Sequence, residues 1–186
     1  MNISGNGQDE KVQAPGLPNE LNGPLDTQCP KGYIIDSISS EWSKVDSDRK
    51  WTATCRKSFF KLSNQCTTYG PFTKLETITF SCPKNGALTG MKSVFESESE
   101  DRLWSLTCCS MGDSCKNKQI SCSWTQPTYI RQAKTSMEIP IGNFVRSVRS
   151  FPYTWEKTSG FWKVARRNLY SDRVWEYEFC LIKKCN

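Results

Sequence analysis

The sequence predicts an all-β, disulfide-rich fold in which three quasi-repeats surround a pseudo-threefold axis, as in a β-prism, with a β-trefoil as the alternative. Three observations predict this fold. The chain of 186 residues contains 10 cysteines and no histidine, a strand motif recurs three times, and 12% of the residues are aromatic. Large aromatic side chains supply burial in small sheets. Repeats of about fifty residues allow either architecture, and closing them on one core removes most exposed strand edges.

The even number of cysteines predicts a framework of disulfide bridges. Disulfides persist in oxidising compartments, so we expect a secreted, extracellular protein. The first residues lack the apolar core of a signal peptide, so we expect that an export signal has been removed. Structural zinc is the alternative use of cysteine, but the chain has neither histidine nor a Cys-x-x-Cys pair, so we expect no metal and no cofactor. The cysteines are Cys29, Cys55, Cys66, Cys82, Cys108, Cys109, Cys115, Cys122, Cys180 and Cys185.

Composition divides the chain into two parts. Residues 1–28 are rich in Gly, Asn, Pro and Gln and are acidic, so we expect a flexible tail. Residues 29–186 are then a single basic domain, because the whole chain carries a net charge of +6. The charged residues of the tail are Asp9, Glu10, Lys11, Glu20 and Asp26.

The domain contains three repeats, at about 29–66, 75–115 and 136–186. Each repeat opens with a turn: Cys29-Pro30-Lys31-Gly32, Cys82-Pro83-Lys84-Asn85-Gly86 or Ile139-Pro140-Ile141-Gly142. Each ends in a strand that starts with Asp-Arg-x-Trp. The motif residues are Asp48, Arg49 and Trp51, then Asp101, Arg102 and Trp104, and finally Asp172, Arg173 and Trp175. The third repeat carries an insertion, roughly over 153–170.

The Asp-Arg-x-Trp motif has two interpretations. Residues two apart share one face of a strand, so Arg49, Trp51 and Cys55 project together, and the guanidinium can lie against the neighbouring indole. The three motifs could then be threefold ligand sites. We expect buried scaffold instead, because the same face ends in cysteine, one of the most buried residue types.

The spacing of the cysteines favours some pairings. We expect Cys29 to pair with Cys55. Cys66 and Cys82 then share Cys108 and Cys109, in an order that stays open. Because Ile139 replaces the opening cysteine of the third repeat, Cys180 pairs elsewhere, with Cys115 or Cys122, and leaves Cys185 for the other.

Three Asp-Arg-x-Trp units, the doubled Cys108-Cys109 and ten cysteines in this order resemble the dermatopontin family, over residues 29–186. That family comprises extracellular matrix proteins that bind proteoglycans, collagen fibrils and cell surfaces, and its invertebrate relatives include haemagglutinins, cell-aggregation factors and a cytotoxin. The resemblance implies an adhesive protein that binds glycans of proteoglycans or cell surfaces. A lectin-like haemagglutinin, aggregation factor or cytotoxin of an invertebrate is the alternative.

The insertion and the strand before it combine cationic and aromatic residues. Arginine binds sulfate or carboxylate through a bidentate fork, and aromatic faces stack on sugars, so we expect a site for acidic glycans. A solvated basic hairpin is the alternative. Nucleic acid is disfavoured because the protein is secreted. The candidate glycan-binding residues are Arg146, Arg149, Trp155, Lys157, Trp162, Lys163, Arg166 and Arg167.

Three further expectations complete the sequence analysis. Met111-Gly112-Asp113 looks like a tripeptide of integrin-binding loops, so an integrin is a further candidate partner. We expect no enzyme, because without histidine there is no Ser-His-Asp or Cys-His arrangement. Cell aggregation requires multivalency, which a homo-oligomer would supply.

Overall fold

The computed structural model describes residues 10–72, 77–98, 101–113, 115, 118–128, 134–153, 155–158, 161–164 and 172–182, with side chains except those of Asp101 and 152–172. Within these ranges the chain forms strands and one 3-10 turn, η1 (Pro83–Asn85). None of the described residues forms a helix with the length and apolarity needed to cross a bilayer. The all-β prediction is confirmed.

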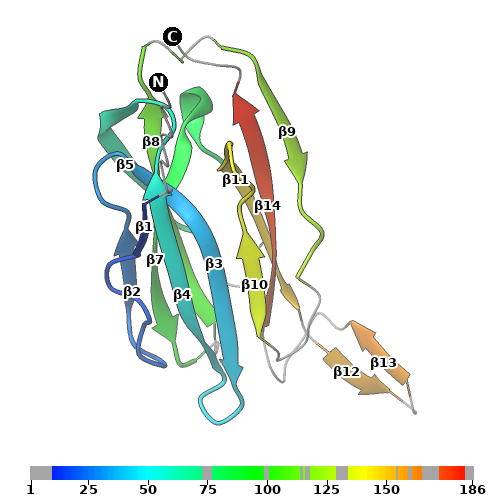
Figure 1. Cartoon of the computed structure of the whole chain (residues 1–186). Helices are drawn as coiled ribbons and strands as arrows, with labels where there is room; N and C mark the ends of the chain where they lie inside the picture. Colours follow the sequence, from blue (N-terminus) through cyan, green and yellow to red (C-terminus); the bar gives the residue numbers. More distant parts are fainter. Residues whose placement is uncertain are drawn as a thin grey trace, which may run out of the picture.

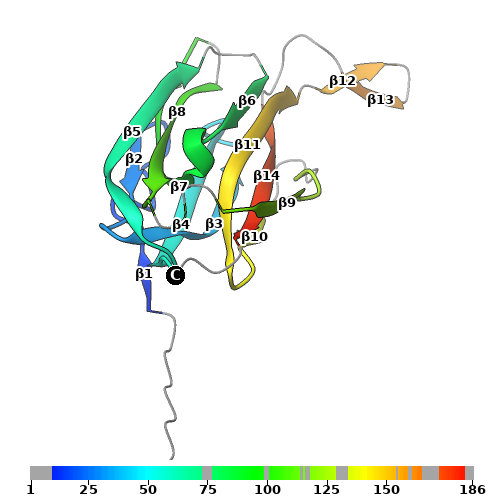
Figure 2. The ribbon, with the colours of Figure 1, turned by 90° about the horizontal axis from the view of Figure 1, so that it is seen from above.

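Three four-stranded sheets surround a common axis, and a long hairpin of one repeat forms the centre of each sheet (Figures 1 and 2). The first sheet has the order β1 (Lys11–Gln13), β4 (Asp48–Lys57), β3 (Tyr33–Ser43), β10 (Thr135–Glu138). The second has the order β2 (Leu25–Gln28), β7 (Ala87–Glu96), β8 (Asp101–Met111), β5 (Leu62–Phe72). The third has the order β6 (Ile78–Ser81), β11 (Asn143–Tyr153), β14 (Asp172–Ile182), β9 (Ile120–Trp124). Three such sheets agree with the predicted threefold repeat and with its prism-like form.

Each repeat gives its opening strand to the sheet of another repeat. Strand β2 precedes the first hairpin but pairs with β7, and β6 precedes the second hairpin but pairs with β11. Strand β10 precedes the third hairpin and pairs with β3 of the first. The three sheets are therefore linked in a closed ring.

A bulge on the first strand of each central hairpin receives this exchange. The bulges lie at Asp36, Thr89 and Arg146, where the register of β3, β7 and β11 shifts. The carbonyl of each bulge residue accepts a hydrogen bond from the amide that follows the exchanged strand. Cys29 N donates to Thr89 O at 2.8 Å, Cys82 N to Arg146 O at 2.9 Å and Ile139 N to Asp36 O at 2.9 Å. A bulge therefore stands at each of the three places where an exchanged strand links one sheet to the next.

The strand after each hairpin also crosses to the next sheet, except at the end of the chain. Strand β5 follows the first hairpin and pairs with β8, and β9 follows the second and pairs with β14. The matching place beside β4 is taken by the N-terminal strand β1. The amino-terminal segment therefore closes the ring.

The prediction that residues 1–28 form a flexible tail is wrong for residues 10–28. Strands β1 and β2 lie in two different sheets, and Ala14, Leu17 and Leu25 are buried in the main core. Asn19 is buried as well and accepts a hydrogen bond from Trp51 N at 2.7 Å. Polar composition suggested a tail, but β1 and β2 are edge strands, and an edge strand needs only a few apolar residues to attach to the core. Residues 1–9 lie outside the described part of the chain.

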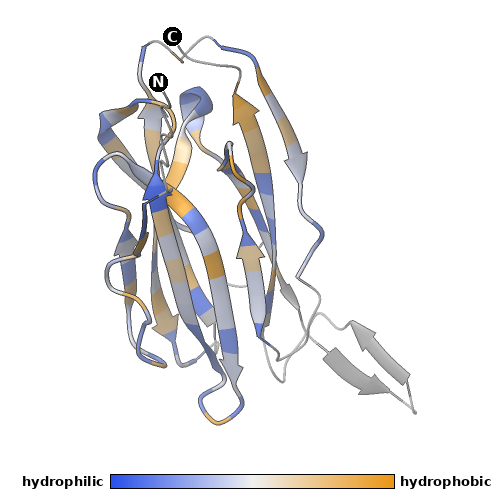
Figure 3. Ribbon diagram, viewed as in Figure 1, coloured by the Kyte–Doolittle hydropathy of each residue, from blue (hydrophilic) through white to orange (hydrophobic). Residues whose placement is uncertain are grey.

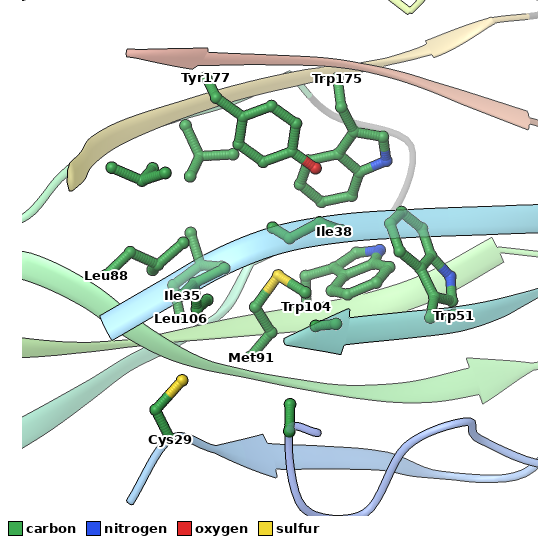
Figure 4. Close-up of a cluster of buried hydrophobic side chains, with 14 of the residues drawn as sticks. Cys29, Ile35, Ile38, Trp51, Leu88, Met91, Trp104, Leu106, Trp175 and Tyr177 are labelled. Carbon is green, nitrogen blue, oxygen red and sulfur yellow. The ribbon is translucent and has the colours of Figure 1, made fainter. Parts of the chain in front are cut away.

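Three tryptophans of the repeated motif form the centre of the core (Figure 4). Trp51, Trp104 and Trp175 are buried and pack edge to face, with ring centroids 5.1, 5.8 and 4.8 Å apart. Their Nε1 atoms have no hydrogen-bond acceptor among the described residues, so ring contacts are their main interactions. The motif is therefore part of the scaffold.

The arginines of the motif, Arg49, Arg102 and Arg173, are buried too. Arg49 lies over Trp42 and Arg102 over Phe95, in each case the residue directly opposite on the neighbouring strand. Both rings lie on the neighbouring strand, whereas the sequence predicted a contact with Trp51 or Trp104. The cross-strand neighbour is closer than a residue one pleat away on the same strand.

Arg102 links two repeats through a buried ion pair. Its Nε and Nη2 donate to the two carboxylate oxygens of Asp48 at 2.8 and 2.6 Å, and Nη1 donates to Ser93 Oγ at 3.0 Å. Asp48 also accepts from Asn22 N at 2.8 Å. This bidentate pair joins motif residues of adjacent repeats.

The described disulfides follow the expected framework. Cys29 pairs with Cys55, Cys66 with Cys109, Cys82 with Cys108, and Cys122 with Cys180. The structure thereby decides the order that the sequence left open. Cys115 is also disulfide-bonded, and Cys185 lies outside the described residues.

Candidate functional site

The pseudo-symmetry of the fold offers an internal standard for finding a site. Where three equivalent positions face solvent and only one repeat carries unusual chemistry, the fold itself does not require that residue. Register gives one such set on the first strands of the hairpins, Ser39, Lys92 and Arg149, and another on the second strands, Thr52, Ser105 and Glu176. On the edge strands the matching residues are Gln13, Thr68 and Trp124.

The outer face of the first sheet is lined by paired hydroxyls. Ser37 contacts Thr54 at 2.7 Å, and Ser39 contacts Thr52 at 2.5 Å. Such pairs satisfy each other and stabilise a sheet. They give this face little that would attract a charged or aromatic partner.

The third sheet differs at the equivalent positions. Arg149 Nη1 lies 3.0 Å from Glu176 Oε2, and the Arg149 guanidinium carbon lies 4.4 Å from the ring centroid of Trp124. Arg149 retains 41% side-chain exposure and Trp124 38%. Trp124, Arg149 and Glu176 therefore form a preorganised cluster on three neighbouring strands, which we call the Trp124 cluster.

Contacts beside the Trp124 cluster hold its neighbours in place. Ser147 Oγ donates to Glu178 Oε2 and lies 2.8 Å from Ser81 Oγ. The Glu176 side chain is 14% exposed, so its carboxylate is held by Arg149 in a partly desolvated place. The cluster presents guanidinium donors, carboxylate acceptors and an indole, the groups that recognise hydroxyl-bearing and acidic sugars.

The predicted insertion is present and forms a separate hairpin. Strands β12 (Trp155–Thr158) and β13 (Phe161–Val164) pair only with each other, and the hairpin projects from the body after β11 (Figures 1 and 2). Its register places Trp155 opposite Val164 and Lys157 opposite Trp162. Each strand of the hairpin thus contains one lysine and at least one aromatic residue.

The structure does not bring all the predicted glycan-binding residues together. Arg149 lies in the Trp124 cluster, four residues before the end of β11. Arg146 is the bulge residue nearer the other end of β11, about 23 Å from Tyr153 at about 3.3 Å per residue, and its Nε is buried without a hydrogen-bond partner. Arg166 and Arg167 lie outside the described residues, as do the side chains of Trp155, Lys157, Trp162 and Lys163.

Sequence reasoning missed Trp124 and Glu176. Trp124 lies outside the insertion, 25 residues before Arg149 in the sequence, and only the pairing of β9 with β14 brings it to this face. The available signal was Cys122, whose bridge to Cys180 fixes that pairing. Glu176 lies between Trp175 and Tyr177, which are buried. Strand alternation therefore predicts that Glu176 faces outward, but the sequence analysis considered only the inward face of this strand.

Two other candidate sites are limited by their surroundings. Met111 is 3% exposed and packs in a second core cluster, so Met111-Gly112-Asp113 does not present three accessible side chains. Cys122, Glu178 and Cys180 lie close together, but the two sulfurs are bonded to each other and offer no thiolate to a metal.

Comparisons with known proteins agree with the fold and its cysteine framework. The family model described as Dermatopontin matches residues 19–185. A dermatopontin of Biomphalaria glabrata is 24% identical over 159 residues, which cover 84% of this chain and 94% of the relative. A hemagglutinin/amebocyte aggregation factor of Limulus polyphemus is 26% identical over 168 residues, 90% of this chain and 88% of the relative. The human dermatopontin is 26% identical over 156 residues, 82% and 70% of the two chains. No solved structure matches the chain significantly.

Proposed function

This chain belongs to the dermatopontin family, and on that premise we propose that it is a secreted adhesive protein that binds acidic glycans of proteoglycans or cell surfaces. An extracellular adhesive or lectin-like role follows from the family and its relatives. The disulfide-bonded fold fits an extracellular setting.

The Trp124 cluster is the observation that carries this proposal. Its three residues occupy positions where the other sheets have Gln13, Thr68 and small hydroxyl residues or a lysine. One Arg149 nitrogen contacts Glu176, and the half-exposed guanidinium has further N–H donors for a sulfate or carboxylate. The indole of Trp124 offers an apolar surface beside those donors.

We propose that the hairpin β12–β13 is part of the same glycan-binding surface as the Trp124 cluster. It follows β11, on which Arg149 lies, and contains Trp155, Lys157, Trp162 and Lys163. The adjacent sequence adds Arg166 and Arg167. A long anionic chain lying over the third sheet would meet cationic residues from both elements, and such binding weakens as salt rises.

A glycan array at low and raised salt tests the proposal. The wild type is compared with Arg149→Ala, with Trp124→Ala and with the double variant Arg166→Ala, Arg167→Ala. Lys92→Ala is the matched control, because Lys92 occupies the position of Arg149 on the second sheet. Salt-sensitive binding to sulfated or sialylated glycans that the first three variants weaken and Lys92→Ala retains is the expected result. Absence of glycan binding, or equal losses in the control, would contradict it.

The second candidate is a lectin-like cell-aggregation factor, favoured by the similarity to the Limulus hemagglutinin/amebocyte aggregation factor. Aggregation needs at least two binding sites per particle. Sedimentation equilibrium together with an erythrocyte agglutination assay separates the two: an oligomer that agglutinates cells supports the aggregation factor, and a monomer that binds glycans without agglutination supports the matrix role.

A further inference from the structure

The three opening turns of the repeats lie at one end of the molecule, opposite the loop between β3 and β4 and the hairpin β12–β13 (Figure 1). We call this the turn end. Strands β3, β7 and β11 begin there, and β4, β8 and β14 finish there (Figure 1). Its residues include Lys31 and Ile141 in the turns and Leu181 at the end of β14.

Three of the exposed large apolar residues lie at the turn end. Phe59 is 47% exposed, Ile141 82% and Leu181 50%. Figure 3 shows apolar colour at the tip of β14, the strand that contains Leu181. Burial within the chain does not explain these side chains.

The three apolar residues belong to neighbouring segments. Leu181 is the register partner of Asn143, two residues after Ile141, and a Cβ added to Gly142 would lie 3.5 Å from Leu181 Cδ1. Phe59 packs edge to face on Phe60 with centroids 5.0 Å apart. Phe60 in turn packs edge to face on Phe144, with ring centroids 5.2 Å apart. Phe144 follows Asn143 in β11. The apolar residues therefore gather around the start of β11.

A rigid base supports this end. Phe60 and Phe144 are buried in the second core cluster together with Ile34, Met111 and Ile182. The cluster also contains the disulfide-bonded Cys115 and Cys180. Side chains presented from such a base lose little entropy when they are inserted into a partner.

Several lysines lie at the turn end, three of them near Phe59. Lys57 and Lys61 flank Phe59 in the sequence, and Lys31 lies beside Lys57 because Tyr33 pairs with Lys57 and Ser58 N donates to Gly32 O at 2.8 Å. Among the residues that the structure describes at this end, exposed carboxylates are fewer than exposed lysines. The exposed lysines are Lys31, Lys57, Lys61, Lys84 and Lys118, and the exposed acidic residues are Glu10, Asp113 and Glu138.

From this combination we propose that the turn end docks on an anionic phospholipid surface, with Phe59, Ile141 and Leu181 entering the interface and the lysines contacting headgroup phosphates. Aliphatic side chains such as Ile141 and Leu181 gain little from a hydroxylated sugar, but they gain from the acyl boundary of a bilayer. Lysine is a compact charge that attracts anionic headgroups. This site is separate from the Trp124 cluster and independent of the proposed glycan binding.

Vesicle co-sedimentation tests the inference with the full chain. Large vesicles of phosphatidylcholine alone are compared with vesicles that contain about one third phosphatidylserine, at about 0.05 M and about 0.5 M salt. The apolar variant is Phe59→Ser with Ile141→Ser, and the charge variant is Lys57→Glu with Lys61→Glu. Their matched controls at the opposite end are Val45→Ser, where Val45 is 94% exposed, and Lys44→Glu with Lys50→Glu.

The expected result is binding to the anionic vesicles that falls with salt, and a loss of about tenfold or more in both turn-end variants, since each removes apolar or ionic contacts worth that factor. The controls keep wild-type binding. Thermal melts and glycan binding of the turn-end variants stay unchanged, which separates this result from misfolding and from failure of the glycan proposal.

Three outcomes overturn the inference. They are no binding to anionic vesicles, equal losses in the turn-end and control variants, and vesicle binding that is lost in Trp124→Ala or Arg149→Ala but kept in the turn-end variants. The last outcome would assign membrane contact to the third sheet.

Discussion

Arg56 occupies the register position in the first sheet that Cys109 occupies in the second. Each directly follows a disulfide-bonded cysteine, Cys55 or Cys108. Cys109 is bridged to Cys66 on β5, and in the third sheet the equivalent Cys180 is bridged to Cys122 on β9. In the first sheet the edge strand is β1, and Lys11 is the partner of Arg56. Two sheets therefore hold their added edge strand by a covalent bond, whereas the first sheet uses ion pairs.

The ion pairs centre on Asp36, the bulge residue of β3. Arg56 Nη1 lies 3.1 Å from Asp36 Oδ1, and Lys11 Nζ lies 2.9 Å from Oδ2. Arg56 also donates to the carbonyls of Ile139 at 3.2 Å and Pro140 at 2.9 Å. The hydrogen bond between Lys11 and Asp36, together with the negative charge of Asp36, raises the pKa of Lys11. These interactions of Lys11, Asp36 and Arg56, which we call the clasp, thus join the N-terminal strand, the first repeat and the third repeat.

Removing Arg56 should be far more harmful than removing Lys11. Arg56→Ala leaves the buried Asp36 carboxylate with Lys11 alone and should lower the free energy of unfolding by about 3 kcal/mol. The Lys11 side chain is 58% exposed, so Lys11→Ala should have a small effect. Urea unfolding followed by tryptophan fluorescence measures both. A double variant Asp36→Ala, Arg56→Ala that loses the sum of the two single losses would contradict a coupled pair.

The clasp should be convertible into the disulfide of the other sheets. The triple variant Lys11→Cys, Asp36→Thr, Arg56→Cys copies Cys66, Thr89 and Cys109 of the second sheet. Because the two existing cross-strand bridges join Cα atoms 4.1 Å apart at the same register position, an additional bridge should form and raise the melting temperature above that of Arg56→Ala. Mass spectrometry after alkylation without reduction detects it. Two extra alkylated thiols would show that β1 does not approach β4 closely enough.

The bidentate pair between Arg102 and Asp48 should tolerate no substitution by lysine. Arg102→Lys keeps the charge but cannot make both bonds to the carboxylate, and it leaves buried acceptors unsatisfied, so we expect a loss of about 2–4 kcal/mol in the free energy of unfolding. Arg149→Lys is the matched control at a half-exposed pair and should cost less than about 1 kcal/mol. Chemical denaturation of the two variants compares them. Equal losses would mean that the buried pair contributes no more than the surface pair.

Alkaline pH should destabilise the fold through Tyr177. Burial raises the pKa of the Tyr177 phenol well above its ordinary value of 10.0. The folded state therefore keeps its proton where the unfolded state loses it, so this contribution to stability is complete below about pH 10 and is lost progressively above it. Tyr177→Phe should flatten this fall in stability between about pH 10 and pH 12. Melting temperatures across that range measure it, and an unchanged slope in the variant would assign the fall to other groups.

Several features were readable from the sequence because they depend on local spacing. The recurrence of Asp-Arg-x-Trp identified the three repeats, and its alternation placed Arg49 and Trp51 on one buried face of a strand. The pair Cys29–Cys55, which the sequence predicted within the first repeat, is confirmed. The insertion in the third repeat was visible as a longer gap between turn and motif.

The tertiary structure alone decided which strands meet. Exchange of β2, β6 and β10 between repeats, and closure by β1, depend on contacts between segments far apart in the sequence, for which local composition carries no signal. The pairing of β9 with β14, also between distant segments, brings Trp124 to Arg149. The sequence by itself thus determined the repeat, its buried face and the pair Cys29–Cys55, since strand periodicity is local. Only the packing of three sheets around one axis decided that residues 10–28 are structural and where the candidate binding surfaces lie.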